Sequence, residues 1–390
     1  MKAINASHST NLLRRKLMLG LGAFSIAPTL LAIERSRNST TLNEEIWVSA
    51  QGKHTDRYGL SWGNPLKAAS NTHLSGFRGH GISLHPRKPH TVMMYARRPG
   101  TQGVELDLKT GRINHRLKCQ VNRHLLGHGC FSRDGQTLFT TEANLQSTQG
   151  LIVARDSETY EVLAEFESGG IGPHEVSVLP DGKTLVVANG GIYTHPDSGR
   201  KQLNLDTMAS NLSYIDLSSG DILESHTVAE AKASIRHLDV ALDGTVAFAM
   251  QMQRGASSHN KVVSLAGLHA QGRAIQLFDH PEQVIFRMKD YAGSVVISPK
   301  TRVVGFTSPK GNIAVFWHVD SKQYIGHHAM HDVCGLAVSA DQRHFILSNS
   351  LGELRYLSAI TLNEDKNRRV RMPKMSFDNH LLVLNEKLNG

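Results

Sequence analysis

The feature that most constrains the fold is a strand–turn–strand unit that recurs along the chain. Each unit has a small or polar start, a short apolar strand, a turn containing Asp, Pro or Gly, and a second apolar strand. In GPHEVSVLPDGKTLVVANGG (172–191), Pro180 presets the backbone of the turn and Gly182 tolerates a positive φ. Matching units occupy 78–96, 127–144, 235–251, 292–308 and 333–349. Such a recurrence indicates a repeat architecture.

A third and a fourth strand follow most of these units. They occupy 103–117, 151–166, 212–228 and 313–328, each pair joined by a polar turn. Four antiparallel strands recurring about every 45 residues are the signature of a β-propeller blade. The remaining segments, 45–64 and 377–385, would form a seventh blade whose innermost strand comes from the C-terminus, which removes exposed strand edges.

We therefore predict an all-β, seven-bladed β-propeller, closed by N- and C-terminal strands that share one blade. A pair of β-sandwiches is the alternative. It would account for the strands, but not for the repeated phase of the turns along the chain.

The first residues are typical of an export signal. Arg14 and Arg15 precede an apolar run from Leu17 to Leu31, which is short for a membrane span and suits a signal peptide. Paired arginines before a modest apolar run resemble the twin-arginine signal, which exports folded proteins. Leu13 and Leu17 depart from the usual residues of that signal. The alternative is that the run is retained as a membrane anchor.

The expected organisation follows from this reading. We predict a twin-arginine-like signal peptide over 1–32, a linker over 33–44 and one propeller domain over 45–390. No other stretch is long and apolar enough to cross a bilayer, so we expect a mature chain without a stable transmembrane segment. We expect it to be periplasmic and monomeric.

Composition narrows the possible functions. The formal charge of +9 is spread along the chain and no nucleic-acid motif accompanies it, so we expect no nucleic-acid partner. The three cysteines, Cys119, Cys130 and Cys334, exclude a disulfide scaffold and haem attached through Cys-x-x-Cys-His. No nucleophile motif and no Gly-rich phosphate loop is present. The 22 histidines are a heavier load than average.

Blade geometry gathers several of these histidines. The first strand of each blade lies innermost, so the residues that open the repeat units converge on one end of the central channel. Four blades then bring imidazole to one polar funnel, one adds a carboxylate and one a guanidinium. These residues are His80, His128, His174, Glu175, Arg236 and His237.

The longest insertion of the chain leaves from the same end. Segment 189–211 follows a second strand, and loops of this length in compact folds are more often functional or disordered than idle. We expect it to cap the channel mouth and to contribute polar side chains to ligand binding. Its candidate residues are Asn189, His195, Asp197, Arg200, Asn204 and Asp206.

Three uses of the funnel stay open. Neutral imidazoles with one carboxylate would form a site for iron, copper or zinc, with His128, His174 and His237 as candidate ligands. Arg236 with protonated histidines would instead bind an anionic ligand, for example a carboxylate-bearing chelate. In the third use, the polar residues only satisfy channel waters and backbone groups.

Three segments carry a family resemblance: GHGCFSRDGQTLFTTEAN (127–144), GIGPHEVSVLPDGKTLVVANGGIYTHPDSGRKQLNLDTM (170–208) and SIRHLDVALDGTVAFAMQ (234–251). They resemble a bacterial family of exported propellers of unknown function, commonly encoded beside imelysin-type iron-uptake proteins and di-haem peroxidase-like proteins. The resemblance covers nearly all of the chain after the signal. It implies a periplasmic location, a seven-bladed fold, a role near iron acquisition and partners among periplasmic iron-uptake proteins.

The family has no established activity, so the resemblance assigns no catalytic residue. It does match polar positions at the expected channel mouth and lid. These positions are His128, His174, Glu175, Asn189, His195, Asp197, Arg200, Asn204, Asp206, Arg236 and His237.

These observations favour a non-enzymatic binding protein linked to iron acquisition. It would hold a metal species such as iron, an anionic ligand or a partner protein at the channel mouth. One alternative is a metal-dependent enzyme or lyase, with His128 or His174 as ligand or base and Arg236 binding charge. The other is a purely structural scaffold. The fold alone does not choose, because propellers host all three.

Overall fold

The computed structural model describes residues 45–52, 57–65 and 69–385 of the 390-residue chain. The predicted signal peptide over 1–32 and the linker over 33–44 lie outside the described residues. Within the described ranges, no helix combines the length and the apolar character that crossing a membrane requires.

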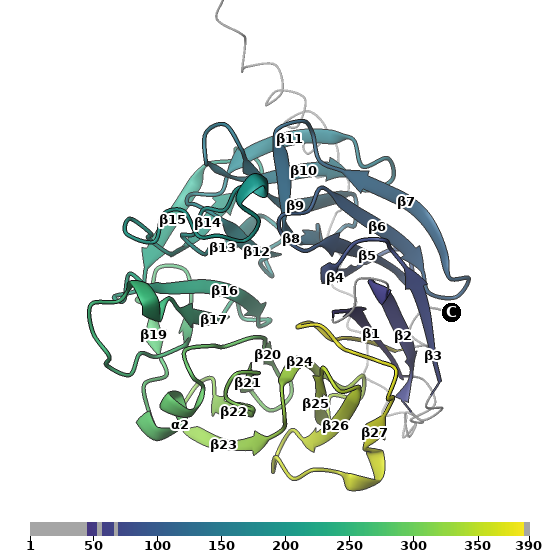
Figure 1. The fold of residues 1–390 in the computed structure, drawn as a ribbon, viewed down its shortest axis with the longest axis vertical. Coiled ribbons are helices and arrows are strands. Elements are labelled where there is room, and N and C mark those ends of the chain that lie inside the picture. The colour runs from purple at the N-terminus through teal and green to yellow at the C-terminus, as the bar shows by residue number, and fades with distance from the viewer. Residues whose placement is uncertain (1–44, 53–56, 66–68, 386–390) are drawn as a thin grey trace, which may run out of the picture.

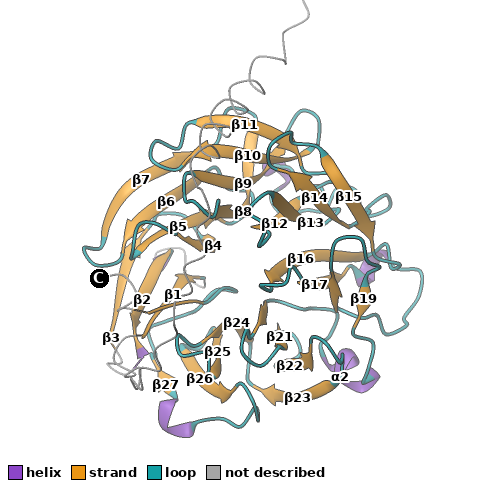
Figure 2. Cartoon of the chain, turned by 180° about the vertical axis from the view of Figure 1, so that it is seen from behind, coloured by secondary structure: helices purple, strands orange, loops and turns teal. Residues whose placement is uncertain are grey.

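Seven four-stranded antiparallel sheets are arranged radially around a central axis (Figures 1 and 2). The predicted seven-bladed β-propeller is therefore confirmed. Blade 2 consists of β4 (Gly79–Leu84), β5 (Thr91–Ala96), β6 (Gln102–Asp107) and β7 (Arg112–Lys118). Blade 3 consists of β8 (Arg123–Phe131), β9 (Thr137–Asn144), β10 (Gly150–Asp156) and β11 (Val162–Glu167). Blade 4 consists of β12 (Pro173–Val178), β13 (Thr184–Asn189), β14 (Asn211–Asp216) and β15 (Ile222–Thr227).

Blades 5 to 7 continue the ring. Blade 5 consists of β16 (Ala233–Val240), β17 (Val246–Met252), β18 (Ala266–His269) and β19 (Gln276–Leu277). Blade 6 consists of β20 (Val295–Ile297), β21 (Val303–Ser308), β22 (Ile313–His318) and β23 (Tyr324–Ala329). Blade 7 consists of β24 (Val333–Val338), β25 (His344–Asn349), β26 (Glu353–Ser358) and β27 (Val370–Arg371). Short helices lie in the connections: η4 (Pro196–Ser198), η5 (Arg254–Ala256), α2 (Glu282–Arg287) and η6 (Lys366–Arg368).

Both ends of the described chain build blade 1. Its strand order is β28 (Leu382–Asn385), β1 (Glu45–Gln51), β2 (Gly59–Asn64) and β3 (Ala69–Leu74), so the C-terminal strand is innermost, as predicted. β28 pairs antiparallel with β1, with Val48 opposite Leu382. The ring of Phe377 packs edge-on against Trp47, with centroids 5.2 Å apart. This pairing covers the inner edge of β1, which would otherwise be open.

The turn chemistry explains why the repeat is visible in the sequence. The Asp181 carboxylate accepts hydrogen bonds from the backbone N–H groups of Lys183 and Thr184 at 2.8 and 3.0 Å. Gly182 has a φ of +68°, which a side chain would disfavour. These local bonds close the hairpin between β12 and β13, and they recur with Asp216 between β14 and β15.

Burial follows the radial position of each strand. All six residues of β13 are buried, because a neighbouring blade covers each face of the middle strands. The outermost strand β15 has no buried residue and alternates between exposed and half-buried positions. Blade-on-blade packing of the inner three strands therefore holds the ring, and the inner strands present their first residues to the channel.

Candidate functional site: five histidines in the central channel

β-bulges interrupt the inner strands where they begin. Strand pairing skips between Gly79 and Ile82, between Leu125 and Gly129, between Pro173 and Glu175, and between Ile235 and His237. The skipped residues include His80, His128, His174 and Arg236. In a regular strand, successive side chains point to opposite faces, and a bulge re-aims one of them. The bulges therefore let the neighbours His174 and Glu175, and Arg236 and His237, reach the channel together.

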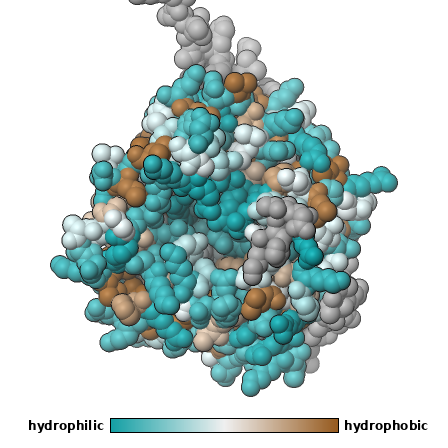
Figure 3. All heavy atoms as spheres, viewed as in Figure 1, coloured by the Kyte–Doolittle hydropathy of each residue, from teal (hydrophilic) through white to brown (hydrophobic). Residues whose placement is uncertain are grey.

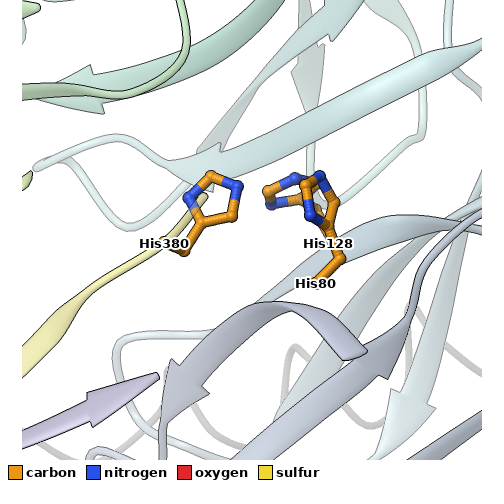
Figure 4. Close-up of side chains that lie close together, drawn as sticks. All are labelled: His80, His128 and His380. Carbon is orange, nitrogen blue, oxygen red and sulfur yellow. The ribbon is translucent and has the colours of Figure 1, made fainter. Parts of the chain in front are cut away.

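Five imidazoles meet at the axis: His80, His128, His174, His237 and His380. Ring centroids of neighbouring pairs lie 4.6 Å apart for His237 and His380, and 4.8 Å apart for His80 and His128. Figure 4 shows His380 approaching from the C-terminal segment and facing His80 and His128. Four of these residues are the channel histidines expected from the repeat phase. His380 is an addition that the structure reveals.

Two glycines make room for this packing. Gly127 has a φ of +108°, and a Cβ there would lie 2.8 Å from Cδ2 of His80. A Cβ on Gly81 would lie 2.7 Å from Nδ1 of His128. Any side chain at either position would push the imidazoles apart.

The cluster contains buried ring nitrogens without a protein partner. Among the described residues, His80 Nδ1 and the Nε2 atoms of His128, His237 and His380 have no hydrogen-bond partner. Leaving a buried polar atom unpaired costs about 1–3 kcal/mol. Four such atoms in one place need partners other than protein groups, and these are either a ligand that binds their lone pairs or channel water.

The imidazoles are neutral at physiological pH. Burial, followed by the charge of Arg236, lowers the pKa of His237 to about 3. Burial and the neighbouring His237 lower the pKa of His380 to about 3 as well. The pKa values of His80, His128 and His174 also fall well below the usual value, chiefly because of burial. A neutral imidazole offers the lone pair that metal binding requires.

Glu175 lies beside two of the rings and hydrogen-bonds one of them, that of His237. Its Oε2 lies 3.2 Å from His237 Nδ1 and accepts the Leu238 N–H at 2.9 Å, while Oε1 lies 3.5 Å from His128 Nδ1. Burial raises the pKa of this carboxyl to about 7. A carboxylate that accepts from Nδ1–H leaves the Nε2 lone pair free. This is the second partner that metal-ligating histidines usually have.

The donor atoms form overlapping groups of three. One nitrogen from each of His80, His128 and His380 lies within 4.8 Å of the others, and so does one from each of His80, His174 and His237. Imidazole nitrogens bind zinc at about 2.0–2.1 Å, so the rings of the first group would have to rotate toward one another to hold an ion.

His174 is the weakest of the three predicted metal ligands. Its Nδ1 faces Nη1 of Arg236 at 3.5 Å. A guanidinium can only donate, so this lone pair is engaged and the hydrogen of the neutral ring sits on Nε2. Of the predicted ligands, His128 and His237 keep a free lone pair, and His80 and His380 join them.

Asp378 supports the cluster from the C-terminal segment. Its side chain is fully buried and pairs with Arg97 at 3.0 Å and with Arg78 at 2.9 Å. Burial alone would raise the pKa of this carboxyl, but the two arginines hold it below its usual value. The ionised Asp378 therefore fixes the segment that carries His380, and lies 3.7 Å from His80 Nδ1.

The imidazoles line two cavities that differ in their other titratable residues. The first, which we call the arginine chamber, has a volume of about 250 Å³ and is lined by His80, Arg97, Arg98, His174, Arg200, Arg236, His237, Gln251, Tyr291 and Asn379. The second, of about 310 Å³, contains His128 and His380 with the acids Glu175 and Asp239. In Figure 3 the centre of the visible face is hollowed and bordered by hydrophilic residues.

Few of the residues predicted in segment 189–211 lie at a channel cavity, in contrast to the predicted histidines. Of its six candidate residues, only Arg200 lines the arginine chamber. Asn189 donates to Ser168 O and Ser213 Oγ, and Asn204 bridges Tyr193 N and Gly191 O. The Nδ1 atom of His195 caps η4 by accepting a hydrogen bond from the backbone N–H of Asp197. The side chain of Asp197 is 89% exposed, and Asp206 is also exposed. Both groups of the Asn204 amide bond the loop backbone, whereas the Oδ1 of Asn189 is buried without a hydrogen-bond partner among the described residues.

Sequence reasoning missed His380, Asp378, Arg97, Arg98 and Tyr291. For two of these residues, their position relative to a predicted strand would have indicated a place at the channel. His380 precedes an inner strand just as His80 and His174 open theirs, and Arg97 follows the exit of a second strand, where rim residues are expected. Tyr291 lies in the irregular connection before blade 6, for which the repeat gives no register.

A second group of possible ligands lies on the outer strands of blades 4 and 5. Glu224, His226 and His269 have ligand atoms within 4.8 Å of one another. Both nitrogens of His269 are already engaged, by the Tyr214 hydroxyl at 2.5 Å and by Arg273 O at 2.8 Å. His226 Nε2 bonds Glu224 at 2.8 Å. This group is satisfied by the protein and provides a control for the channel cluster.

Residues 74–384 match the family described as "Protein of unknown function (DUF1513)". The chain belongs to this family. All five channel histidines, Asp378 and the four arginines of the chamber fall within the part that matches the DUF1513 family. None of the curated proteins matches the chain in sequence. Among solved structures, the hydrazine synthase of Kuenenia stuttgartiensis is similar at 12% identity and a TM-score of 0.45, over 72% of this chain and 95% of that one.

We expect the metal-free protein to lose stability steeply as pH falls below about 6.5. The unfolded chain binds protons at its histidines with a pKa near 6.5, whereas the folded channel histidines stay neutral. Each such histidine costs up to about 1.4 kcal/mol per pH unit below that value. Glu175 acts in the opposite sense, because its raised pKa favours folding at low pH and that contribution is lost as pH rises through about 7.

Urea unfolding of the metal-free protein at pH 7, 6 and 5 measures this dependence. His237→Leu removes one of the histidines and should flatten the slope by about 1.4 kcal/mol per pH unit. Of the charged groups that face His237, Arg236 with a pKa of about 10 and Asp378 with a lowered pKa stay ionised over this range, whereas Glu175 titrates near the top of it and opposes the histidine slope. Equal stability at pH 7 and pH 5 would show that the channel imidazoles are not buried and neutral.

Proposed function

We propose that this protein is a periplasmic binding protein that holds a transition metal ion among the channel imidazoles and serves iron acquisition. The observation that carries the proposal is the set of buried ring nitrogens without protein partners on His80, His128, His237 and His380. Imidazole ligands suit iron, copper, nickel and zinc. Iron is the metal that the resemblance of segments 127–144 and 170–208 implies, and the paired arginines at 14 and 15 support export.

The described residues favour binding over turnover. All three thiols are free, and burial raises the pKa of each; that of Cys130 rises to about 12, so none provides a reactive thiolate. The ligands come from three inner strands and the C-terminal segment of a closed ring, which suits a fixed site. We propose periplasmic iron-uptake proteins as the partners that deliver or receive the metal.

The proposal is tested by the metal content of protein purified from the periplasm. We expect about one transition metal ion per chain in the wild type, and loss of the metal in His128→Ala and in His380→Ala. His174→Ala should retain most of the metal, because Arg236 already engages that ring. Inductively coupled plasma mass spectrometry gives the stoichiometry.

His226→Ala is the matched control, since it removes an imidazole from the satisfied group on the outer strands. It should keep the wild-type metal content. Each variant is compared at equal folded fraction by circular dichroism. A wild type without metal, or full metal content in both His128→Ala and His380→Ala, would contradict a metal site in the channel.

A further inference from the structure

The arginine chamber holds more positive charge than the protein neutralises. Of its four arginines, Arg97 pairs with Asp378. The side chains of Arg98 and Arg200 form no hydrogen bond or ion pair with any described residue, and Arg236 bonds only His174 Nδ1. No carboxylate is among the described residues that line the chamber. Three guanidinium groups therefore face one space without an acidic partner.

Two of these three arginines are deeply buried. Arg98 is 9% exposed and Arg236 is 3% exposed, and the Nε of Arg236 has no hydrogen-bond partner among the described residues. Burying a charge is costly unless it is paired and hydrogen-bonded. Arg97 and Arg200 line the same chamber, and their positive charges repel that of Arg236. An anion in the chamber would relieve both effects.

The size of the chamber limits what this anion is. A water molecule occupies about 30 Å³, so a volume of about 250 Å³ has room for roughly eight water-sized groups. This exceeds a single inorganic oxyanion and suits a small organic molecule. Tyr291, Gln251 and Asn379 also line the chamber, and their hydroxyl and amide groups can bond neutral oxygens.

We propose that the arginine chamber binds a small organic anion with two or three carboxylate groups. Arg98, Arg200 and Arg236 supply planar forks that match carboxylates in bidentate pairs. The proposal goes beyond the proposed function, because the chamber and its charge do not require a metal. His80, His174 and His237 line the same chamber, so the anion would lie beside the imidazoles.

Isothermal titration calorimetry with citrate, acetate and inorganic phosphate tests this on the full exported chain. Metal is first removed with the uncharged chelator 1,10-phenanthroline and dialysis, so the outcome is separate from that of the metal analysis. We expect citrate to bind more tightly than either acetate or phosphate. Arg98→Gln and Arg236→Gln should each weaken citrate binding at least tenfold.

Two further variants keep the test decisive. Arg200→Gln changes an exposed loop residue without disturbing the core, and should also weaken citrate binding even if a buried variant fails to fold. Arg302→Gln is the control, because that arginine pairs with Asp320 on the surface and should leave citrate binding unchanged. Citrate binding no tighter than acetate, tighter binding of phosphate, or wild-type citrate affinity in Arg200→Gln and in each folded buried variant would overturn the proposal.

Discussion

Asp378→Asn is expected to lower the free energy of unfolding by about 3 kcal/mol. The carboxylate is fully buried and neutralises Arg97 and Arg78, and removing one partner of a buried ion pair costs about 3–5 kcal/mol. Because the Arg78 side chain is 35% exposed and that of Arg97 is 15% exposed, water partly compensates them and the lower end applies. Urea unfolding at pH 7.5 measures the difference.

The matched control for this substitution is Asp320→Asn. That carboxylate is 57% exposed and also pairs with an arginine, Arg302, at 2.6 Å. An exposed ion pair contributes little, so we expect a change within about 1 kcal/mol. If Asp378→Asn and Asp320→Asn cost the same, the buried carboxylate does not hold the C-terminal segment in place.

A chain that ends at Met375 is expected to lose stability more severely than any point variant. It would lack β28, and the core would lose Phe377, Leu381 and Leu384, which are 2%, 7% and 5% exposed in the full chain. Burying each such side chain contributes about 1.5–3 kcal/mol, so the sum is comparable with the total stability of a typical domain. The open edge of β1 would then be free to pair with other chains.

Thermal unfolding and size-exclusion chromatography with light scattering distinguish the outcomes. We expect the chain ending at Met375 to melt at a much lower temperature than wild type, and to self-associate. The control is a chain ending at Asn385, which keeps the whole of β28 and should behave like wild type. A monomeric chain ending at Met375 with the wild-type melting temperature would show that the shared blade does not close the ring.

The sequence predicts the ring because the information is local and repeated. Asp181 and Gly182 determine one hairpin through bonds within four residues, and the same chemistry recurs with Asp216 and Gly220. Because the turns repeat, they also indicate where each inner strand begins. The pairing of β28 with β1 is long-range, but it follows from two leftover segments in a ring that has to close.

The sequence predicts only those site residues that stand at the start of a repeat unit. His80, His128, His174 and His237 open repeat units, so their place at the channel follows from the repeat. His380 lies just before the four-residue strand β28, which no repeat motif introduces, and its role depends on the closure of the ring. The sequence also does not reveal the bulges, which aim consecutive residues such as Arg236 and His237 into the same channel.

Polarity alone does not separate binding residues from structural ones. Asn204 is as polar as Arg200, yet both groups of its amide bond nearby backbone, which only the folded loop reveals. For the same reason His174 differs from His128: one ring is engaged by Arg236 and the other keeps a free nitrogen. Hydrogen-bond partners, rather than residue types, decide which side chains are available to a ligand.

X-ray absorption spectroscopy of the metal-loaded protein would detect imidazole coordination in the channel without reference to any physiological role. We expect a first shell with at least three nitrogen ligands, at about 2.0–2.1 Å when zinc is the loaded metal, and the outer-shell scattering of imidazole rings. His128→Ala should remove this signature and His226→Ala should keep it. A first shell of oxygen atoms alone, or an imidazole signal unchanged by His128→Ala, would contradict metal binding by His80, His128, His237 and His380.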